Sequence, residues 1–223
     1  MPPYPPTADL YELIGRRRDV RAEFTGGALR DEVLNRLLGA AHAAPSVGLS
    51  QPWDFILVRD ASTRRAFQEH VATERDVYGA LLDEERRRLF DQIKIEGILE
   101  STLGIVVTYD PGRGGPAVLG RHAIDDAGLY SVVTAIQNLW LAATAEEVGV
   151  GWVSFYRESF LQELLGIPGG VRPVAWLCVG PVSHLHPKPE LERCGWRERR
   201  PLELAVHRER WGATGDAMIP LRS

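Results

Sequence analysis

A short stretch near the start of the chain concentrates positive charge. From Gly15 to Arg21 it reads Gly-Arg-Arg-Arg-Asp-Val-Arg, with four arginines and one aspartate. Guanidinium groups this close repel one another, and their planar forks match phosphate oxygens two at a time. The stretch is therefore a candidate phosphate site. The simpler alternative is a solvated basic helix end, where cations are favoured by the helix dipole.

A second basic cluster lies near the other end of the chain, at Arg197, Arg199 and Arg200. If the two clusters converge in the fold, they would surround a terminal phosphate from two sides. The whole chain has a net charge of −4, so both clusters are local features of a mildly acidic protein. This balance argues against a general nucleic-acid binder and favours a small anionic ligand.

Asp19 and Ser154 are the candidates for acid, base or hydroxyl chemistry. A carboxylate such as Asp19 can remove protons as a general base, but it can also do no more than balance its arginine neighbours. Ser154 lacks the glycine-flanked elbow of hydrolases, so we interpret it as a hydrogen-bonding hydroxyl at a strand end.

Metal and nucleotide-loop signals are weak. Of six histidines only His184 and His186 are close in sequence, and nothing near them completes a set with the usual ligand spacing, so we predict no metal site. Neither a Gly-x-Gly-x-x-Gly loop after a strand nor a Walker lysine motif occurs.

Hydrophobic periodicity predicts a layered α+β domain of residues 1–223, with helices packed on a small sheet. The residue at 45 is a proline, which ends the second helix. The helix over 124–148 is apolar on nearly all faces and belongs either to the core or to a dimer interface. We expect helices over 9–18, 28–42, 124–148 and 158–165, and strands over 55–58, 104–109, 150–155 and 172–180.

Residues 61–100 differ from the rest because they are highly charged and mostly helical, with few large apolar residues before Leu89. We interpret them as the least core-like part of the chain, either a lid over a pocket or a surface helical hairpin. Residues 201–223 form a C-terminal extension that wraps over a neighbour.

The two cysteines form no disulfide framework, so we expect reduced thiols. The N-terminus lacks the apolar region of a signal peptide, and no apolar stretch reaches the length of a membrane span. These features predict a cytoplasmic protein without a membrane or nucleic-acid partner.

Four features occur in a fixed order along the chain. They are Arg17-Arg18-x-x-Arg21, the loop Pro45-Ser46-x-x-x-x-Gln51-Pro52-Trp53, the strand Gly149-Val150-Gly151-Trp152, and the basic stretch before Pro201-Leu202. Together they resemble the FMN-binding nitroreductase superfamily. Within it, the chain is similar to the flavin-destroying branch, the 5,6-dimethylbenzimidazole synthases, chiefly because Asp19 stands where ordinary nitroreductases usually carry serine.

The resemblance implies a nitroreductase-like three-layer fold with a small central mixed sheet flanked by helices. It also implies a domain-swapped homodimer with two FMN sites at the subunit interface. The residues that match the family's flavin contacts are Arg17, Arg18, Asp19, Val20 and Arg21, then Pro45, Ser46 and Val47 from the other subunit, and Arg197 and Arg199 at the phosphate. Leu49 replaces an asparagine often found in the family loop.

The implied reaction consumes reduced FMN with O2 and yields 5,6-dimethylbenzimidazole, the lower ligand of cobalamin, and erythrose 4-phosphate. Asp19 and Ser154 match the residues implicated in that chemistry, and a flavin reductase or another source must supply reduced FMN. An ordinary FMN-dependent NAD(P)H nitroreductase or flavin reductase is the first alternative. A non-catalytic flavin carrier or sensor is the second.

Overall fold

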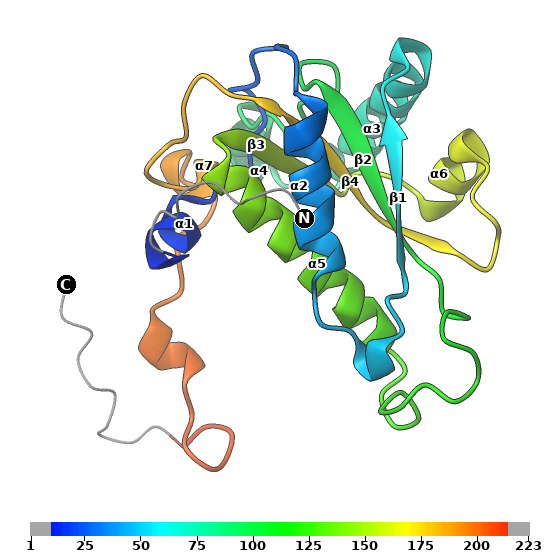
Figure 1. Ribbon diagram of the computed structural model, residues 1–223. Helices are drawn as coiled ribbons and strands as arrows, with labels where there is room; N and C mark the ends of the chain where they lie inside the picture. Colours follow the sequence, from blue (N-terminus) through cyan, green and yellow to red (C-terminus); the bar gives the residue numbers. More distant parts are fainter. Residues whose placement is uncertain (1–9, 214–223) are drawn as a thin grey trace.

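The structure is a computed structural model that describes residues 10–213 (Figure 1). Its elements agree with the predicted α+β pattern. In chain order they are α1 (Leu10–Arg16), α2 (Asp31–His42), the 3-10 turn η1 (Val47–Leu49), β1 (Trp53–Val58), α3 (Ala61–Gly79), α4 (Glu84–Asp91), β2 (Leu103–Tyr109), α5 (Ala127–Ala145), β3 (Val148–Val153), α6 (Glu158–Leu165), β4 (Arg172–Pro181), α7 (Glu190–Arg193) and the 3-10 turn η2 (Leu202–Ala205).

The sheet has the order β1-β2-β4-β3, and each neighbouring pair of strands is antiparallel. The mixed character expected of it is limited to one isolated parallel bridge, between Asp19 and Val150. Each of the four strands has antiparallel neighbours only, while the segment after α1 runs parallel to β3 over a single residue pair. β2 is buried along its whole length, as its run of β-branched residues predicts for a central strand.

α2 and α5 cover one face of the sheet (Figure 1). Alternate β2 side chains, Ile105 and Val107, pack with Ile136 of α5 in the first hydrophobic core. The core alternative for α5 is confirmed on its inner face, and the dimer-interface alternative stays a prediction. Its inner face is fully buried, whereas Tyr130 and Val133 on the outer face are 57% and 43% exposed.

The other face of the sheet carries a second core, and residues 61–100 supply much of it. The ring of Phe67 in α3 stacks on Trp176 of β4, with ring centroids 4.0 Å apart. The expectation that this region is the least core-like is therefore wrong. Its apolar residues are few, but α3 aligns Phe67 with Val71 one turn later, and the segment after α4 adds Ile98. A lid function stays a prediction.

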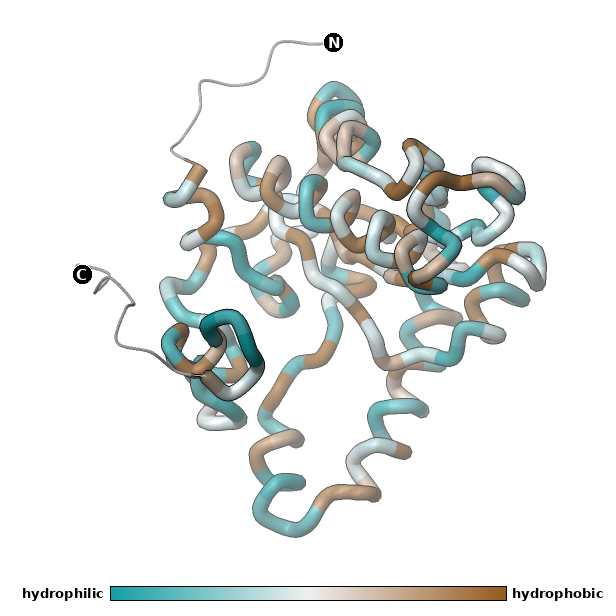
Figure 2. The backbone as a smooth tube through the Cα atoms, turned by 90° about the horizontal axis from the view of Figure 1, so that it is seen from below, coloured by the Kyte–Doolittle hydropathy of each residue, from teal (hydrophilic) through white to brown (hydrophobic). Residues whose placement is uncertain are grey.

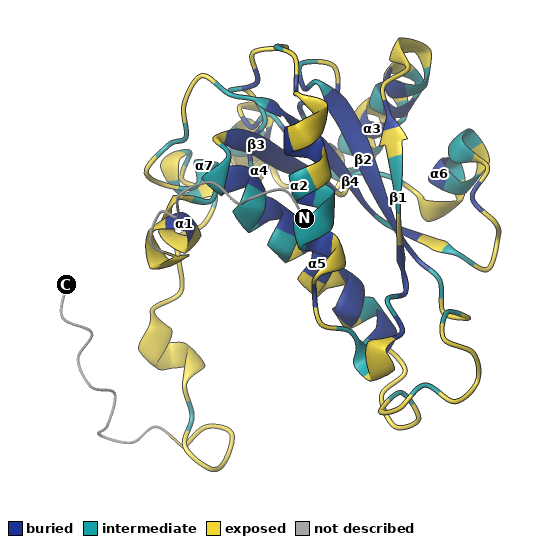
Figure 3. Ribbon diagram, viewed as in Figure 1, coloured by how far each residue is buried: buried dark blue, intermediate teal, exposed yellow. Residues whose placement is uncertain are grey.

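Hydrophobic and hydrophilic residues are interleaved along the helices (Figure 2). This pattern is expected where one face of a helix packs on the protein and the other faces solvent. After α7 the chain leaves the body of the molecule, and the 3-10 turn Leu202–Ala205 is exposed throughout (Figure 3). Among residues 10–213 no helix combines the length and hydropathy that crossing a bilayer needs.

Candidate functional site

The segment after α1 is held against the start of β3. The backbone N–H of Val20 donates to the carbonyl of Val150 at 3.0 Å. The approach is so close that a Cβ on Gly151 would lie 2.0 Å from the carbonyl oxygen of Val20. A side chain at position 151 would therefore push the segment away from the strand, which gives the Gly-Val-Gly-Trp motif a physical reason.

Asp19 is fixed by both oxygens of its carboxylate. Oδ1 accepts a hydrogen bond from the backbone N–H of Trp152 at 2.8 Å. Oδ2 accepts two from the Arg21 guanidinium, from Nη2 at 2.7 Å and Nε at 3.1 Å. The side chain remains 31% exposed. Asp19 thus balances the charge of Arg21, as one of the two interpretations of the sequence expects. Its carboxylate is also oriented by the backbone of β3 and remains partly exposed to solvent.

Arg21 joins three parts of the chain. Besides Asp19, its Nη1 donates to the carbonyl of Lys94 at 3.0 Å and lies 3.4 Å from Oε2 of Glu190 in α7. Burial raises the pKa of Glu190, while the positive charge of Arg21 opposes that rise. The predicted contact between Arg21 and a flavin edge stays a prediction, because here the guanidinium is engaged by protein acceptors.

Arg18 lies where the two basic clusters meet. Nη1 donates to the carbonyls of Gly15 and Arg17, both at 2.7 Å, and Nη2 donates to the carbonyl of Pro187. Nε is buried without a hydrogen-bond partner. Burial lowers the pKa of Arg18, and the charges of Arg17 and then Arg199 lower it further. Arg199 of the second cluster thus lies close enough to Arg18 for its charge to act on it, and the convergence of the two whole clusters stays a prediction.

The neighbouring predicted residues are placed less tightly. The guanidinium of Arg17 lies over the ring of Trp140 in α5, 4.9 Å from its centroid. The indole N–H of Trp140 donates to the carbonyl of Arg18 at 3.0 Å. Arg197 is exposed, and its backbone N–H is bonded to the carbonyl of Leu191.

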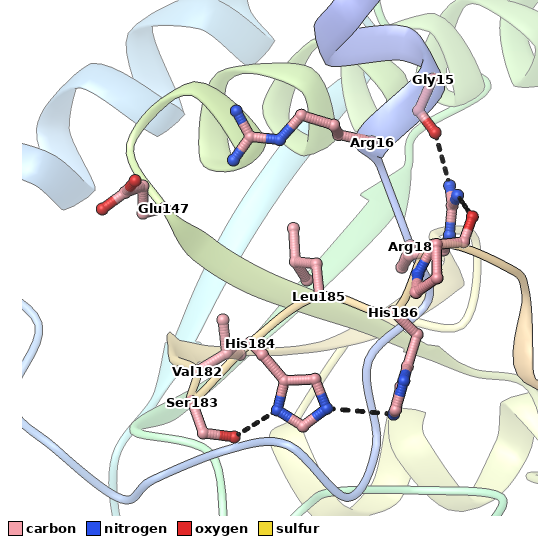
Figure 4. A pocket seen from close by; sticks show the side chains of 10 residues that line it. Gly15, Arg16, Arg18, Glu147, Val182, Ser183, His184, Leu185 and His186 are labelled. Carbon is pink, nitrogen blue, oxygen red and sulfur yellow. Dashed lines mark hydrogen bonds between the residues drawn. The ribbon is translucent and has the colours of Figure 1, made fainter.

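A cavity of about 420 Å³ opens beside Arg18 (Figure 4). Arg16 and Arg18 border it from one side and Glu147 from the end of α5, while residues 182–187 close it. A buried, unpaired guanidinium N–H next to converging cations fits an anionic group such as a phosphate. Sequence reasoning missed Trp140, Glu147 and 182–187, because a polar, proline-rich segment after a strand signals only a loop.

Ser154 and Asp19 are linked through β3 but do not line the same cavity. Ser154 is exposed just after the strand, two residues beyond the Trp152 N–H that binds Asp19. It borders a different cavity of about 370 Å³, together with Tyr78 and Phe155. The structure thus confirms a hydroxyl at a strand end.

The predicted residues at 45–47 lie at the other end of α5. The backbone N–H of Val47 donates to Ser131 Oγ at 3.0 Å, and Thr134 Oγ1 donates to the carbonyl of Pro45 at 3.1 Å. The side chain of Ser46 accepts from the backbone of the loop itself, at residue 51. Arg17 and Arg18 instead contact α5 at residue 140, about 9–14 Å further along the axis. One chain therefore does not bring these two groups together.

Comparison with known proteins identifies the family of this chain. The model of the nitroreductase family matches residues 14–181, which span the arginines, the sheet and both cores. The chain belongs to the nitroreductase family. The resemblance inferred from the sequence motifs is therefore confirmed, and so is the nitroreductase-like fold class.

Nitroreductase-family relatives carry a more specific name. A 5,6-dimethylbenzimidazole synthase of Rhodospirillum rubrum is 40% identical over 83% of this chain and 87% of its own length. A second protein of that name, from Rhodobacter capsulatus, is 34% identical over 87% of this chain and 93% of its own length.

Among solved structures, iodotyrosine deiodinase bound to FMN and 3-iodo-L-tyrosine superposes with a TM-score of 0.68. It is 21% identical and covers 81% of this chain and 93% of its own chain. This likeness supports the three-layer nitroreductase fold, which several further nitroreductase-family structures share.

Proposed function

We propose that the protein, as one domain of residues 1–223, fragments reduced FMN with O2 into 5,6-dimethylbenzimidazole and erythrose 4-phosphate, while the remaining atoms of the pyrimidine half of the flavin leave as a separate fragment. The observation that carries the proposal is the carboxylate of Asp19, held by Trp152 N–H and Arg21 where ordinary nitroreductases usually have a hydroxyl. Two relatives at 40% and 34% identity bear the name of that synthase, which supports the same choice.

The basic residues are suited to the phosphate of FMN. Arg18 has a buried Nε without a partner, and Arg17 and Arg199 are close enough to add positive charge around it. Arg197 would add a further charge from the same segment. Bound reduced FMN would supply both the carbon skeleton of the products and the electrons that reduce oxygen.

In this proposal Asp19 accepts protons, and Ser154 orients oxygen or the flavin. Breaking the ribityl chain requires proton removal from hydroxyl or carbon centres, and a carboxylate with an accessible edge can accept such protons. The bonds from Trp152 and Arg21 hold that carboxylate in one orientation, so little reorganisation is needed. The exposed Ser154 hydroxyl would orient oxygen or the flavin by hydrogen bonding.

The proposal includes a homodimer. Pro45, Ser46 and Val47 would reach the flavin of the second copy, since within one chain they lie at the far end of α5 from Arg18. Tyr130 and Val133 give α5 an exposed apolar face, and the segment after α7 exposes Leu202, Leu204 and Trp211, the last by 89%. These surfaces are suited to cover each other in a pair of chains. Reduced FMN would come from a separate reductase in the cytoplasm.

Absorbance of the flavin under air tests the proposal. The protein is mixed anaerobically with reduced FMN and then exposed to oxygen. A synthase leaves part of the flavin permanently bleached, because the ring system is destroyed. An NAD(P)H nitroreductase or a flavin carrier instead returns all of the oxidised flavin absorbance. Complete recovery at stoichiometric enzyme would overturn the proposal, and steady NAD(P)H oxidation with recycled flavin would favour the nitroreductase.

A further inference from the structure

Three metal-ligating side chains converge beside Arg18. Glu23 Oε1 lies 3.1 Å from His186 Nε2, and His186 Nε2 lies 3.2 Å from His184 Nε2. One ligand atom from each residue lies within 4.8 Å of the other two. Figure 4 shows the imidazole rings of His184 and His186 edge to face, with a nitrogen of each directed at the other, among the residues that line the cavity at Arg18.

The fold, not the sequence spacing, makes this cluster. Phe24 and Val182 form an antiparallel bridge, and the backbone N–H of Ser183 donates to the carbonyl of Glu23 at 3.0 Å. The segment after β4 therefore lies alongside the segment that follows the arginines. His184 and His186, two residues apart, then face the carboxylate of Glu23.

Hydrogen bonding alone satisfies the cluster poorly. A single atom, His186 Nε2, faces both Glu23 and His184, and an imidazole nitrogen carries either one N–H or one lone pair. If it donates to Glu23, it has no lone pair to accept from His184, so one N–H must be shared between two acceptors. A cation between the three atoms would instead use one lone pair from each.

The other atoms of these side chains are already oriented by the protein. His184 Nδ1 is 3.0 Å from Ser183 Oγ, and that hydroxyl donates to the carbonyl of Glu23 at 3.4 Å. The hydroxyl oxygen is then placed to accept from Nδ1–H, which leaves the lone pair of His184 at Nε2. Glu23 Oε2 accepts from the backbone N–H groups of Arg21 at 3.3 Å and Ala22 at 3.2 Å, leaving Oε1 for the cluster. Such outer hydrogen bonds fix the ligands of metal sites.

The spacing also fits coordination. Ligand atoms at about 2.0–2.1 Å from a tetrahedral or octahedral metal lie about 2.8–3.4 Å from one another. Two of the three separations in the cluster, 3.1 and 3.2 Å, fall in this range, and the third is within 4.8 Å. The nearby cation Lys188 is paired with Glu192 at 3.1 Å, and Arg18 is bonded to carbonyl oxygens.

We propose that Glu23, His184 and His186 bind one divalent transition-metal ion of the zinc type. Two imidazoles and a carboxylate suit such ions, and three protein ligands leave a position for water. The ion would tie the segment that carries Asp19 to the segment that closes the cavity. This proposal reverses our sequence prediction of no metal site, which considered residues near the histidines in sequence and so missed Glu23.

Zinc binding to tag-free, chelator-dialysed protein tests the site, with Zn²⁺ titrated against a chromophoric chelator. We expect one Zn²⁺ per chain. His186→Ala should weaken its binding by at least about 100-fold and Ser183→Ala by about tenfold, in line with the loss of a ligand and of an outer partner. His122→Ala, which removes an exposed histidine elsewhere, should bind like the parent.

Thermal melts keep the test decisive if a variant folds poorly. Zn²⁺ should raise the melting temperature of the parent protein and of His122→Ala, but not of His186→Ala. Glu23→Gln, which keeps the shape of the side chain, serves as the second variant and should lose the shift as well. Absence of binding to the parent would show that the cluster is only a shared hydrogen bond, and binding unchanged in both variants would place the ion elsewhere. Either result overturns the proposal.

Discussion

Two regions assigned to one flavin site by resemblance are built very differently in this chain. The arginine segment, Gly15–Arg21, is bonded to β3 through Asp19 and Val20 and to α5 through Trp140. The loop at 45–53 is bonded to the opposite half of α5 and leaves Leu49 79% exposed. The first region is tied to two elements of its own chain, whereas the second carries a large exposed apolar side chain.

Under the proposed function, a single chain holds the phosphate and carboxylate part of the site, and a second chain would bring the loop. The exposed face of α5, at Tyr130 and Val133, lies at the loop end of the helix and would form that contact. Chemistry and phosphate binding would then depend on the arginine segment, and assembly on the other half of α5.

The largest effect is expected at Asp19. Asp19→Asn keeps an acceptor for Trp152 N–H but removes the basic carboxylate, so formation of 5,6-dimethylbenzimidazole should fall by about 10²- to 10⁴-fold. FMN binding, measured by fluorescence quenching, should change little. Asp91→Asn, on the exposed end of α4, is the charge-matched control. Product formation at the parental rate would show that Asp19 is only the partner of Arg21.

The proposed contact between two chains is tested by a substitution at Val133. Val133→Asp places a charge on the exposed face of α5, and we expect monomers in analytical ultracentrifugation and FMN binding weakened by about 30-fold, as for an interface hot spot. Leu99→Asp is a matched control because Leu99 is exposed to 41%, close to the 43% of Val133. A monomeric Val133→Asp that binds FMN normally would contradict the need for a second chain.

A smaller effect is expected at Arg199, within the phosphate part. Arg199→Ala should weaken FMN binding by about tenfold, because a hydrogen bond to a charged group contributes about 1.5–3 kcal/mol. Riboflavin, which lacks the phosphate, should bind as before. Arg65→Ala on the exposed side of α3 controls for net charge. Equal losses for both flavins would place Arg199 away from the phosphate.

The smallest effect lies outside both regions, at His70. Its Nε2 accepts from the backbone N–H of Arg157 at 3.0 Å, and its ring stacks on Phe160. Burial lowers the pKa of His70, an effect that Glu74 opposes and the charge of Arg157 reinforces.

The unfolded chain therefore binds more protons than the folded one below pH about 6.5, so the free energy of unfolding should fall as the pH drops from that value. In urea melts between pH 7 and 5, His70→Gln should show a shallower fall. Parallel curves for the two proteins would show that His70 does not contribute.

Much of the fold was predictable because periodicity and buried strands are local signals. The apolar run of β4 and the helix α5 were found from their residues alone. Residues 61–100 were misjudged because Phe67 and Val71 are sparse in sequence and form a core only when α3 aligns them over Trp176.

The site was predictable where it is local, as in the contact of Asp19 with Arg21. It was not predictable where distant segments meet. No spacing rule links Glu23 to His184, Trp140 to Arg18, or Gly151 to the carbonyl of Val20, because each pairing is created by the sheet and by the bridge at Phe24.

The proposed reaction consumes reduced FMN and does not recycle it. Mass spectrometry of the products, after reduced FMN and air are added to the protein, measures this directly. We expect one molecule of 5,6-dimethylbenzimidazole and one of erythrose 4-phosphate for each FMN lost, with none from Asp19→Asn. Recovery of all the flavin as intact FMN, with neither product, would contradict the account.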